Sequence, residues 1–220
     1  MIVLAIDCSS PVCSLALTRG ETILGTRAWD ADGRSRQQLF PHLESLLRDA
    51  GVTALAIDLI AVGRGPGNFS GLRSSMAAAQ AMALPDGKPV LAVSSGRMVG
   101  TSAFASDSEL ARIRVLGDAR RGTLWYADFL RPDPGGIVAP AEWRLASEEE
   151  LLRDAVPAVT SDPARLRTAY PRISETLAAP DALTPSAPIL ASLALHEHTH
   201  GLPSEPFAPV YMHPAVLSPA

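Results

Sequence analysis

Residues 63–73, with the sequence GRGPGNFSGLR, have the composition of a loop that could hold an anion. Gly65, Gly67 and Gly71 permit positive φ values and a close approach of the backbone to a neighbouring group. Their amides, with the N-terminus of a following helix, could cradle a phosphate. The spacing differs from the dinucleotide pattern G-x-G-x-x-G, because a proline and a phenylalanine interrupt it. The alternative is a tight strand-to-helix turn that brings the helix close to a neighbour.

Asp7 follows an apolar run and precedes the residues CSSP. A carboxylate at the end of a strand could bind a magnesium ion or accept hydrogen bonds from the following turn. Pro11 lacks the amide hydrogen that could have bound a phosphate. We therefore interpret Asp7 as a turn-capping residue, with the magnesium ligand as the alternative. Cys8 and Cys13 are too few for a four-cysteine zinc site and are typical of thiols in a reducing cytoplasm.

Residues 196–200, HEHTH, match the H-E-x-x-H pattern of zinc hydrolases. On a helix, His196 and His200 would share a face and could hold zinc, with Glu197 as the general base. Gly201 and Pro203 end the helix directly afterwards, and no third ligand is evident. Histidines in a last helical turn also interact favourably with the helix dipole. We therefore predict a solvated helix end, and we keep a zinc peptidase as an alternative.

The chain is acidic overall, so binding to nucleic acid would need a local cluster of arginines. Its 220 residues carry 19 Lys and Arg against 23 Asp and Glu, which gives a net charge of −4. All the basic residues except Lys88 are arginines, and the DGKP segment around Lys88 does not form a phosphate-binding P-loop. Five arginines lie in predicted loops or helix starts and could contact phosphates, or be paired or solvated: Arg64, Arg73, Arg97, Arg120 and Arg121.

The hydrophobic pattern predicts an α/β protein whose first half has the order β-β-β-α-β-α-β. We expect strands over residues 2–6, 12–17, 22–29, 59–63, 89–93, 112–116, 123–130 and 158–160, a turn over 117–122, and helices over 37–50, 72–84, 147–154 and 187–200. No apolar run reaches the roughly 20 residues that a membrane-spanning helix requires. The sequence therefore indicates no membrane segment.

The two helices of the first half carry more apolar residues than one sheet face needs. In the first, Leu39, Leu43 and Leu46 can face the core, and Phe40 and Leu47 are apolar residues that this contact does not need. In the second, one stripe comprises Leu72, Met76, Ala79 and Ala83, and another comprises Ala78 and Met82. Surplus apolar surface of this kind favours a subunit contact. The alternative is that both stripes are buried within one domain.

Several segments together resemble the TsaB family of bacterial tRNA threonylcarbamoyladenosine biosynthesis proteins. They are the opening residues IVLAIDCSS, the helix start LFPHL, the loop AVGRGPGNFSGLR, the segment DARRG before an aromatic strand with Trp125 and Tyr126, and the C-terminal PVYM. The resemblance spans nearly the whole chain and is strongest up to Val93. The family usually has Ser-Phe-Thr where this chain has Asn68-Phe69-Ser70, and Thr in place of Cys8.

The resemblance implies two ribonuclease-H-like subdomains of the actin/Hsp70/sugar-kinase type, with mixed sheets flanked by helices, over residues 1–98 and 99–220. It implies a cytoplasmic, non-catalytic accessory subunit without a cofactor or metal. This subunit would dock on a TsaD-like catalytic subunit, work with a TsaE-like ATPase, reach tRNA through the complex, and possess a homodimeric form when alone. An independent ATP-binding enzyme of the actin/sugar-kinase type is the alternative.

The same resemblance assigns the two helices of the first half to the partner interface. The interface residues that we expect are Leu39, Phe40, Leu43, Leu47, Leu72, Met76, Ala79, Gln80 and Ala83. The glycine loop comprises Gly65, Pro66, Gly67, Asn68, Phe69, Ser70, Gly71 and Arg73. The residues that we expect to contact a nucleotide or tRNA are Arg64, Arg120 and Arg121.

Overall fold

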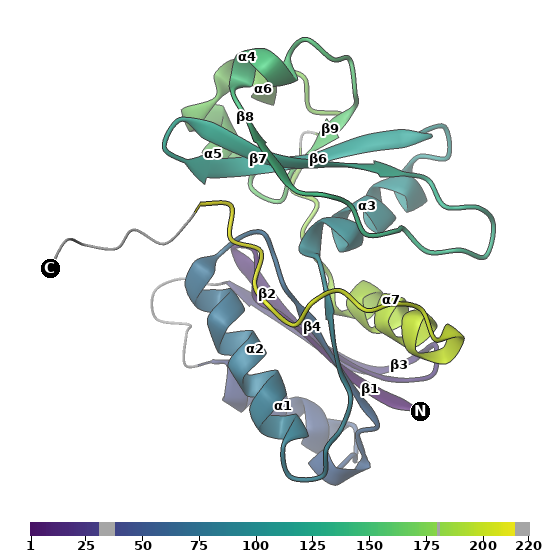
Figure 1. Cartoon of the computed structure of the whole chain (residues 1–220). Coiled ribbons are helices and arrows are strands. Elements are labelled where there is room, and N and C mark those ends of the chain that lie inside the picture. The colour runs from purple at the N-terminus through teal and green to yellow at the C-terminus, as the bar shows by residue number, and fades with distance from the viewer. Residues whose placement is uncertain (31–37, 180, 214–220) are drawn as a thin grey trace, which may run out of the picture.

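The computed structural model describes residues 1–30, 38–179 and 181–213. They form two α/β halves, one above the other in Figure 1. Each half contains one mixed sheet with helices packed against it, so the α/β fold class predicted from the sequence is confirmed.

The first sheet combines an antiparallel meander with two parallel strands. The meander consists of β1 (Ile2–Asp7), β2 (Val12–Arg19) and β3 (Thr22–Asp30). The parallel strands are β4 (Leu59–Gly63), which pairs with β1, and β5 (Val90–Val93), which pairs with β4. The order is therefore β3-β2-β1-β4-β5, the order of a ribonuclease-H-like sheet.

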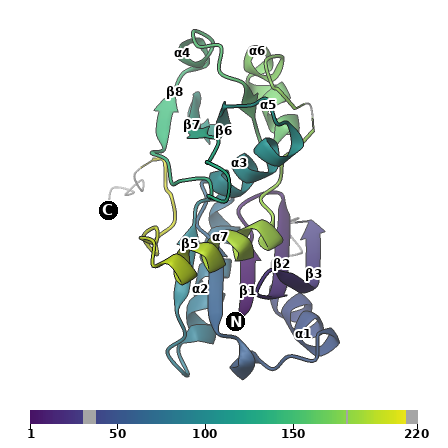
Figure 2. The ribbon, with the colours of Figure 1, turned by 90° about the vertical axis from the view of Figure 1, so that its right-hand side faces the viewer.

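Helices cover both faces of the first sheet (Figure 2). On one face, α1 (Leu39–Asp49) and α2 (Phe69–Ala83) pack against alternate residues of β1, such as Leu4 and Ile6. On the other face, α7 (Ala187–His200) packs against the intervening residues, such as Val3. Because both faces are buried, β1 is continuously apolar from Ile2 to Ile6 instead of alternating.

The second sheet repeats the order of the first four strands. A meander of β6 (Arg112–Arg120), β7 (Thr123–Leu130) and β8 (Arg144–Ala146) is joined by β9 (Ala158–Val159), which pairs in parallel with β6. The order is β8-β7-β6-β9. The helices of this half are α3 (Ser95–Ser106), α4 (Glu148–Leu151), α5 (Pro163–Ala169) and α6 (Pro171–Ser174), and a 3-10 turn, η2 (Ala54–Ala56), lies in the first half.

Some predicted elements were wrong at their ends or absent. The predicted turn over 117–122 is largely strand, because β6 continues to Arg120, and the predicted helix over 147–154 is the single turn α4. Helix α2 begins at Phe69 because the Asn68 side chain accepts a hydrogen bond from the amide of Gly71 and caps it. Residue 37, the predicted start of the first helix, lies outside the described residues. Helices α3, α5 and α6 and strand β8 were not expected from the sequence.

The chain crosses between the two halves more than once. Helix α3 packs on the second sheet, with Phe104 in the same core cluster as Phe129. Helix α7 returns to the first sheet, and the segment after it runs back towards the second half (Figure 1). The division into residues 1–98 and 99–220 stays a prediction. Among the described residues, none of the helices combines the length and apolar character needed to cross a bilayer.

Candidate functional site

The glycine loop packs directly on the turn between β1 and β2. The amide of Asn68 donates to the Ser9 carbonyl at 2.7 Å, and the amide of Gly65 donates to Ser95 Oγ at 3.1 Å. A Cβ atom at Gly67 would overlap the Ser9 carbonyl, and one at Gly71 would overlap the Cys8 carbonyl. The glycines therefore allow two backbone segments to touch, as in the packing alternative. The amides of Gly65, Asn68 and Gly71, which could have held a phosphate, therefore already have partners.

Asp7 lies beneath this contact and is completely buried. Its carboxylate accepts hydrogen bonds from the amide and hydroxyl of Ser9 at 3.0 and 2.8 Å, and from Ser95 Oγ at 3.3 Å. A Cβ atom at Gly63 would overlap the same carboxylate. Burial raises the pKa of Asp7, and these hydrogen bonds oppose the rise. Asp7 therefore caps the turn, and neither oxygen faces a space that could hold a magnesium ion.

The H-E-x-x-H motif is divided between the core and the surface. His198 and His200 are exposed, as predicted, and the His200 ring stacks on His196 with centroids 4.1 Å apart. Glu197 is 2% exposed, so the prediction of a solvated helix end was wrong for this residue. Its Oε1 lies 2.6 Å from Nη1 of the fully buried Arg97. A carboxylate held in such an ion pair is not available as the general base of a peptidase.

The ionic cluster around Arg97 and Glu197 also includes Arg64, through Glu205. Glu205 lies 3.1 Å from Arg97 Nη1 and 3.1 Å from Arg64 Nη1, and it accepts a hydrogen bond from the amide of Ser94 at 2.8 Å. Arg64 Nε also donates to the carbonyl of Ala208 at 2.9 Å. Arg64 therefore anchors the C-terminal segment, and its predicted contact with nucleotide or tRNA stays a prediction. Burial raises the pKa of Glu197, and Arg97 opposes the rise. Arg97, predicted to lie in a loop or helix start, lies in the first turn of α3.

The predicted partner interface on α1 and α2 is only partly at the surface. Six of its nine residues belong to the core: Leu39, Leu43, Leu72, Met76, Ala79 and Ala83. Five of them pack between the helices and the sheet, and Leu72 lies against Gly65 of the glycine loop, so they offer almost no exposed contact area in this structure. The residues still accessible are Phe40, which is 61% exposed, Gln80 and the partly exposed Leu47.

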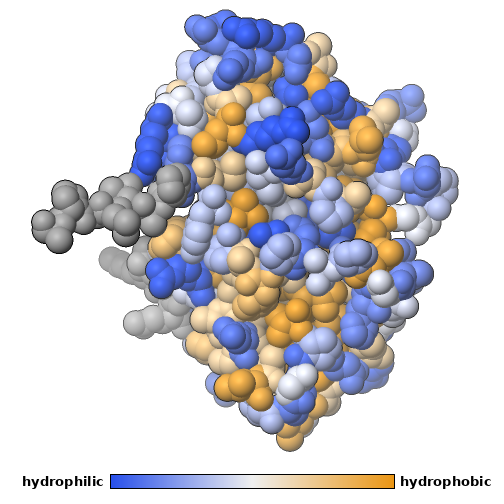
Figure 3. All heavy atoms as spheres, viewed as in Figure 1, coloured by the Kyte–Doolittle hydropathy of each residue, from blue (hydrophilic) through white to orange (hydrophobic). Residues whose placement is uncertain are grey.

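Exposed small and apolar residues extend this face along α2. Ala77, Ala81 and Leu84 lie on the solvent side of the helix, and Leu84 is 80% exposed. Figure 3 shows orange surface over the lower half of the molecule, where α2 faces the viewer. The sequence pattern therefore placed buried residues of the core stripe in the expected interface, and the assignment of the interface to α1 and α2 stays a prediction.

A cleft of about 1020 Å³ separates the two halves. Its lower wall comes from the β1–β2 turn, the glycine loop and Arg73, and its upper wall from the β6–β7 turn and the start of α5. Residues 210–213 of the C-terminal segment close one side. The predicted contact residues Arg120 and Arg121 line this cleft and are exposed. Sequence reasoning missed Arg165, because nothing in its local sequence marks it.

Comparison with known proteins links this arrangement to tRNA modification. The sequence model of the family described as TsaD, tRNA N6-adenosine threonylcarbamoyltransferase, matches residues 30–134. The tRNA threonylcarbamoyladenosine biosynthesis protein TsaB of Escherichia coli (strain K12) is 29% identical over 155 residues, which cover 70% of this chain and 65% of that protein. The protein of the same name from Haemophilus influenzae is 27% identical over 227 residues, which cover 96% of this chain and 93% of that protein.

An uncharacterized protein of Mycobacterium tuberculosis (strain H37Rv) is 34% identical over 130 residues. The chain spans 58% of that relative and 65% of the Escherichia coli one, less than two thirds of either. The solved structure of YeaZ from Pseudomonas aeruginosa superposes with a TM-score of 0.75 at 27% identity, over 96% of this chain and 99% of that one. The likeness therefore includes both halves of the molecule.

Proposed function

This chain belongs to the TsaB family, and we propose that it is a non-catalytic accessory subunit in the formation of threonylcarbamoyladenosine in tRNA. The observation that carries the non-catalytic role is the closed corner at Asp7. The carboxylate that ends β1 is buried under the glycine loop, and the amides of Asn68 and Gly65 donate to Ser9 and Ser95. A buried carboxylate in such a corner serves packing and is not accessible to the metal of a magnesium nucleotide, which argues against the ATP-dependent enzyme.

In this proposal the chain acts by docking on a TsaD-like catalytic subunit in the cytoplasm. The exposed parts of α1 and α2, with Phe40, Leu47, Gln80 and Leu84, supply the contact surface. Exposed apolar side chains beside small residues allow close approach of a partner helix, and they are costly to leave in water. A TsaE-like ATPase and tRNA join through that complex. In the absence of the catalytic subunit, the same face pairs two copies of this chain.

The docking surface is tested by Phe40→Asp. Phe40 is exposed on α1, so a carboxylate there leaves the monomer core intact but places a charge in the proposed interface. We expect at least a tenfold weaker affinity for the catalytic subunit, a loss of about 1.4 kcal/mol or more. The measurement is titration calorimetry with the purified TsaD-like subunit. Met76 is unsuitable for this test because it is buried.

Leu130→Asp is the matched control, since Leu130 is 69% exposed but lies at the end of β7 in the other half. This variant should bind the catalytic subunit as the wild type does. If both variants bound the catalytic subunit as tightly as the wild type does, α1 would not be part of the interface. If both variants lost binding, the contact would not be confined to the exposed face of α1 and α2.

A further inference from the structure

The interdomain cleft is basic although the protein is acidic. Arg73, Arg120 and Arg121 line it from two elements, one in each half. Within the described residues, none of these three guanidinium groups has a carboxylate within ion-pair distance. Free guanidinium groups that converge on one cavity attract an anion with several charges.

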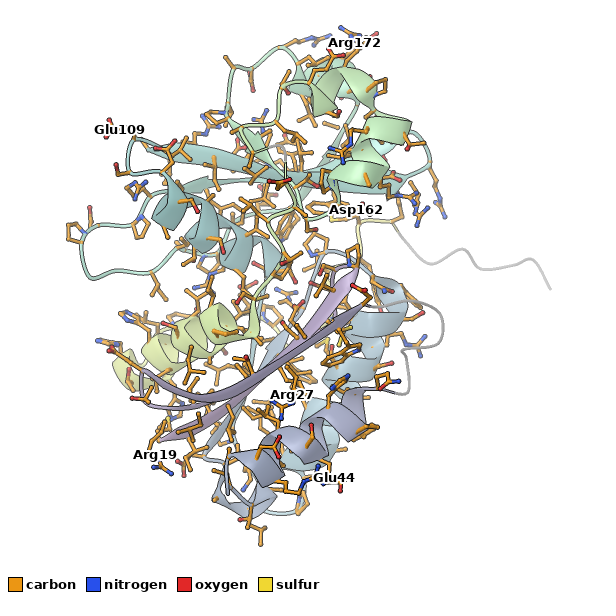
Figure 4. The ribbon with its side chains drawn as sticks, turned by 180° about the vertical axis from the view of Figure 1, so that it is seen from behind. Arg19, Arg27, Glu44, Glu109, Asp162 and Arg172 are labelled. Carbon is orange, nitrogen blue, oxygen red and sulfur yellow. The ribbon has the colours of Figure 1, made fainter. Side chains whose placement is uncertain are left out.

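The carboxylates in the cleft are already occupied. Asp118 Oδ2 lies 2.5 Å from Nε of Arg165, and Asp162 caps α5 by accepting a hydrogen bond from the amide of Arg165 at 3.1 Å. Figure 4 shows Asp162 at the level between the two halves. These acids therefore neutralise Arg165 and the start of α5, and they leave the charges of the other arginines uncompensated.

The β6–β7 turn holds its two arginines in a defined position. Arg120 and Arg121 both have left-handed backbone conformations, with φ values of 69° and 54°. The Asp118 carboxylate accepts a hydrogen bond from the amide of Arg120 at 2.7 Å, and Thr123 Oγ1 donates to the carbonyl of Arg120 at 3.1 Å. Asp118 is fixed in turn by Arg165. The turn is thus pre-organised to present two cationic side chains at the cleft mouth.

Aromatic rings line the cleft from both halves of the molecule and from the C-terminal segment. Phe69 is 53% exposed and Tyr211 is 50% exposed, and their ring centroids are 5.2 Å apart. The Arg73 guanidinium lies over the Phe69 ring at 5.3 Å. Trp125 lines the cleft from β7. Exposed rings stack on nucleobases, and neighbouring arginines bind the phosphates between them.

The cleft fits a nucleic acid strand better than a magnesium nucleotide. The Asp7 carboxylate, which would hold the metal of a magnesium nucleotide, is buried, and the amides of Gly65 and Asn68 already donate to Ser95 and Ser9. The free cations are side chains at the cleft mouth, the usual place for contacts with a phosphodiester backbone. The volume of about 1020 Å³ is also at the upper limit of the roughly 300–1,000 Å³ typical of small-molecule pockets.

We propose that this cleft binds a single-stranded segment of RNA, with phosphates on Arg73, Arg120 and Arg121 and a base stacked on Tyr211. This inference rests on the proposed function, because an RNA substrate gives the cleft its ligand. It adds a direct RNA contact by this chain to a role that docking alone does not require.

The test is fluorescence anisotropy of a short fluorescein-labelled single-stranded RNA of mixed sequence, titrated with the full chain at several salt concentrations. The wild type should bind, and its affinity should fall as salt rises. The variant Arg120→Glu/Arg121→Glu should bind roughly tenfold more weakly or worse. Its salt slope should be smaller by about 1.4, since each phosphate contact to a single strand contributes about 0.7.

The matched control is Arg19→Glu/Arg172→Glu, which changes the net charge equally at two exposed arginines far from the cleft, at opposite ends of the molecule in Figure 4. It should retain the affinity of the wild type within about twofold. Tyr211→Ala should lower the affinity roughly five- to hundredfold, the range for one stacked base, with no change in salt slope. Thermal unfolding of each variant should show that it is folded.

Equal RNA binding by the two charge-reversal variants would overturn the proposal, as would an absence of salt-dependent binding by the wild type. Binding of a fluorescent ADP analogue with magnesium that the RNA cannot displace would also overturn it, because the cleft would then be a nucleotide site. The docking proposal is judged separately, because Arg120→Glu/Arg121→Glu leaves the exposed face of α1 and α2 unchanged and should bind the catalytic subunit normally.

Discussion

The two halves of the molecule contain the same corner, closed in one and open in the other. In each, an aspartate at or near the end of the meander's first strand accepts a hydrogen bond from the amide two residues later: Asp7 from Ser9 at 3.0 Å, and Asp118 from Arg120 at 2.7 Å. In each, the fourth strand leads to a helix that a side chain caps at its third residue. That third residue differs, and the difference decides what the corner can do.

In the first half the third residue of α2 is Gly71, which lets the helix touch the Cys8 carbonyl. In the second half the third residue of α5 is Arg165, whose side chain fills the gap to Asp118. The first corner is therefore closed by backbone packing over a buried carboxylate, and the second carries an ion pair at the cleft. Two similar sheets can therefore have a tightly packed backbone contact at one corner and a charged surface at the other, depending on the residue at one helix position.

The largest expected effect comes from forcing the closed corner apart with Gly71→Ala. Helix propensity alone predicts that alanine stabilises α2 by about 1 kcal/mol. Because its Cβ would overlap the Cys8 carbonyl, a backbone atom that cannot rotate away, we expect instead a loss of about 3 kcal/mol in the free energy of unfolding. Urea unfolding followed by circular dichroism measures the change.

Gly122→Ala is the control at the open corner. Nothing lies within 4 Å of its added Cβ, so only the left-handed φ of 75° opposes the substitution, at about 1 kcal/mol. A Gly71→Ala variant as stable as Gly122→Ala, or more stable, would mean that the glycine loop is not tightly packed on the β1–β2 turn.

A smaller effect is expected from removing the charge of Asp7. Since burial raises the pKa of Asp7 above its ordinary value of 3.8, the folded state binds this proton more tightly than the unfolded state. Its contribution to stability is therefore complete below about pH 3.8 and is lost as the pH rises through the folded pKa. Asp7→Asn removes this loss, so the stability of the variant relative to the wild type should increase from pH 4 to pH 7, as measured by urea unfolding.

Asp118→Asn is the matched change at the open corner and should act in the opposite direction at pH 7. It removes the charge that holds Arg165, at a cost of about 1 kcal/mol for a partly exposed pair. If Asp7→Asn were the more damaging of the two at neutral pH, Asp7 would have a role that its burial does not explain.

The sequence predicted elements whose signals are local. Strands β4 and β7 and helix α7 have the expected bounds, and α7 ends at Gly201, whose φ of 62° suits the glycine there. Helix α3 was missed because Gly96 and Gly100 lower its intrinsic propensity and its burial on nearly all sides removes the amphipathic pattern. At Gly96 the Trp143 ring occupies the space of a side chain, so tertiary packing stabilises this helix.

The candidate site could be predicted only in part for the same reason. The glycine loop was recognisable as a special backbone, but its partner, the Ser9 carbonyl, comes from a distant segment. Likewise, Arg73, Trp125 and Tyr211 converge on the cleft from segments far apart in the sequence. The burial of Glu197 depended on Arg97, one hundred residues earlier, which no spacing rule connects to it.

The central claim is that this chain supports a reaction without performing it, and reconstitution of the modification tests that claim most directly. Threonylcarbamoyladenosine would be quantified in tRNA incubated with a TsaD-like subunit, a TsaE-like ATPase, the threonylcarbamoyl donor, and either no chain, the wild type or Asp7→Asn. The account predicts product only when the chain is present, and equal rates for the wild type and Asp7→Asn. Product from the chain without the TsaD-like subunit, or loss of product with a folded Asp7→Asn, would contradict it.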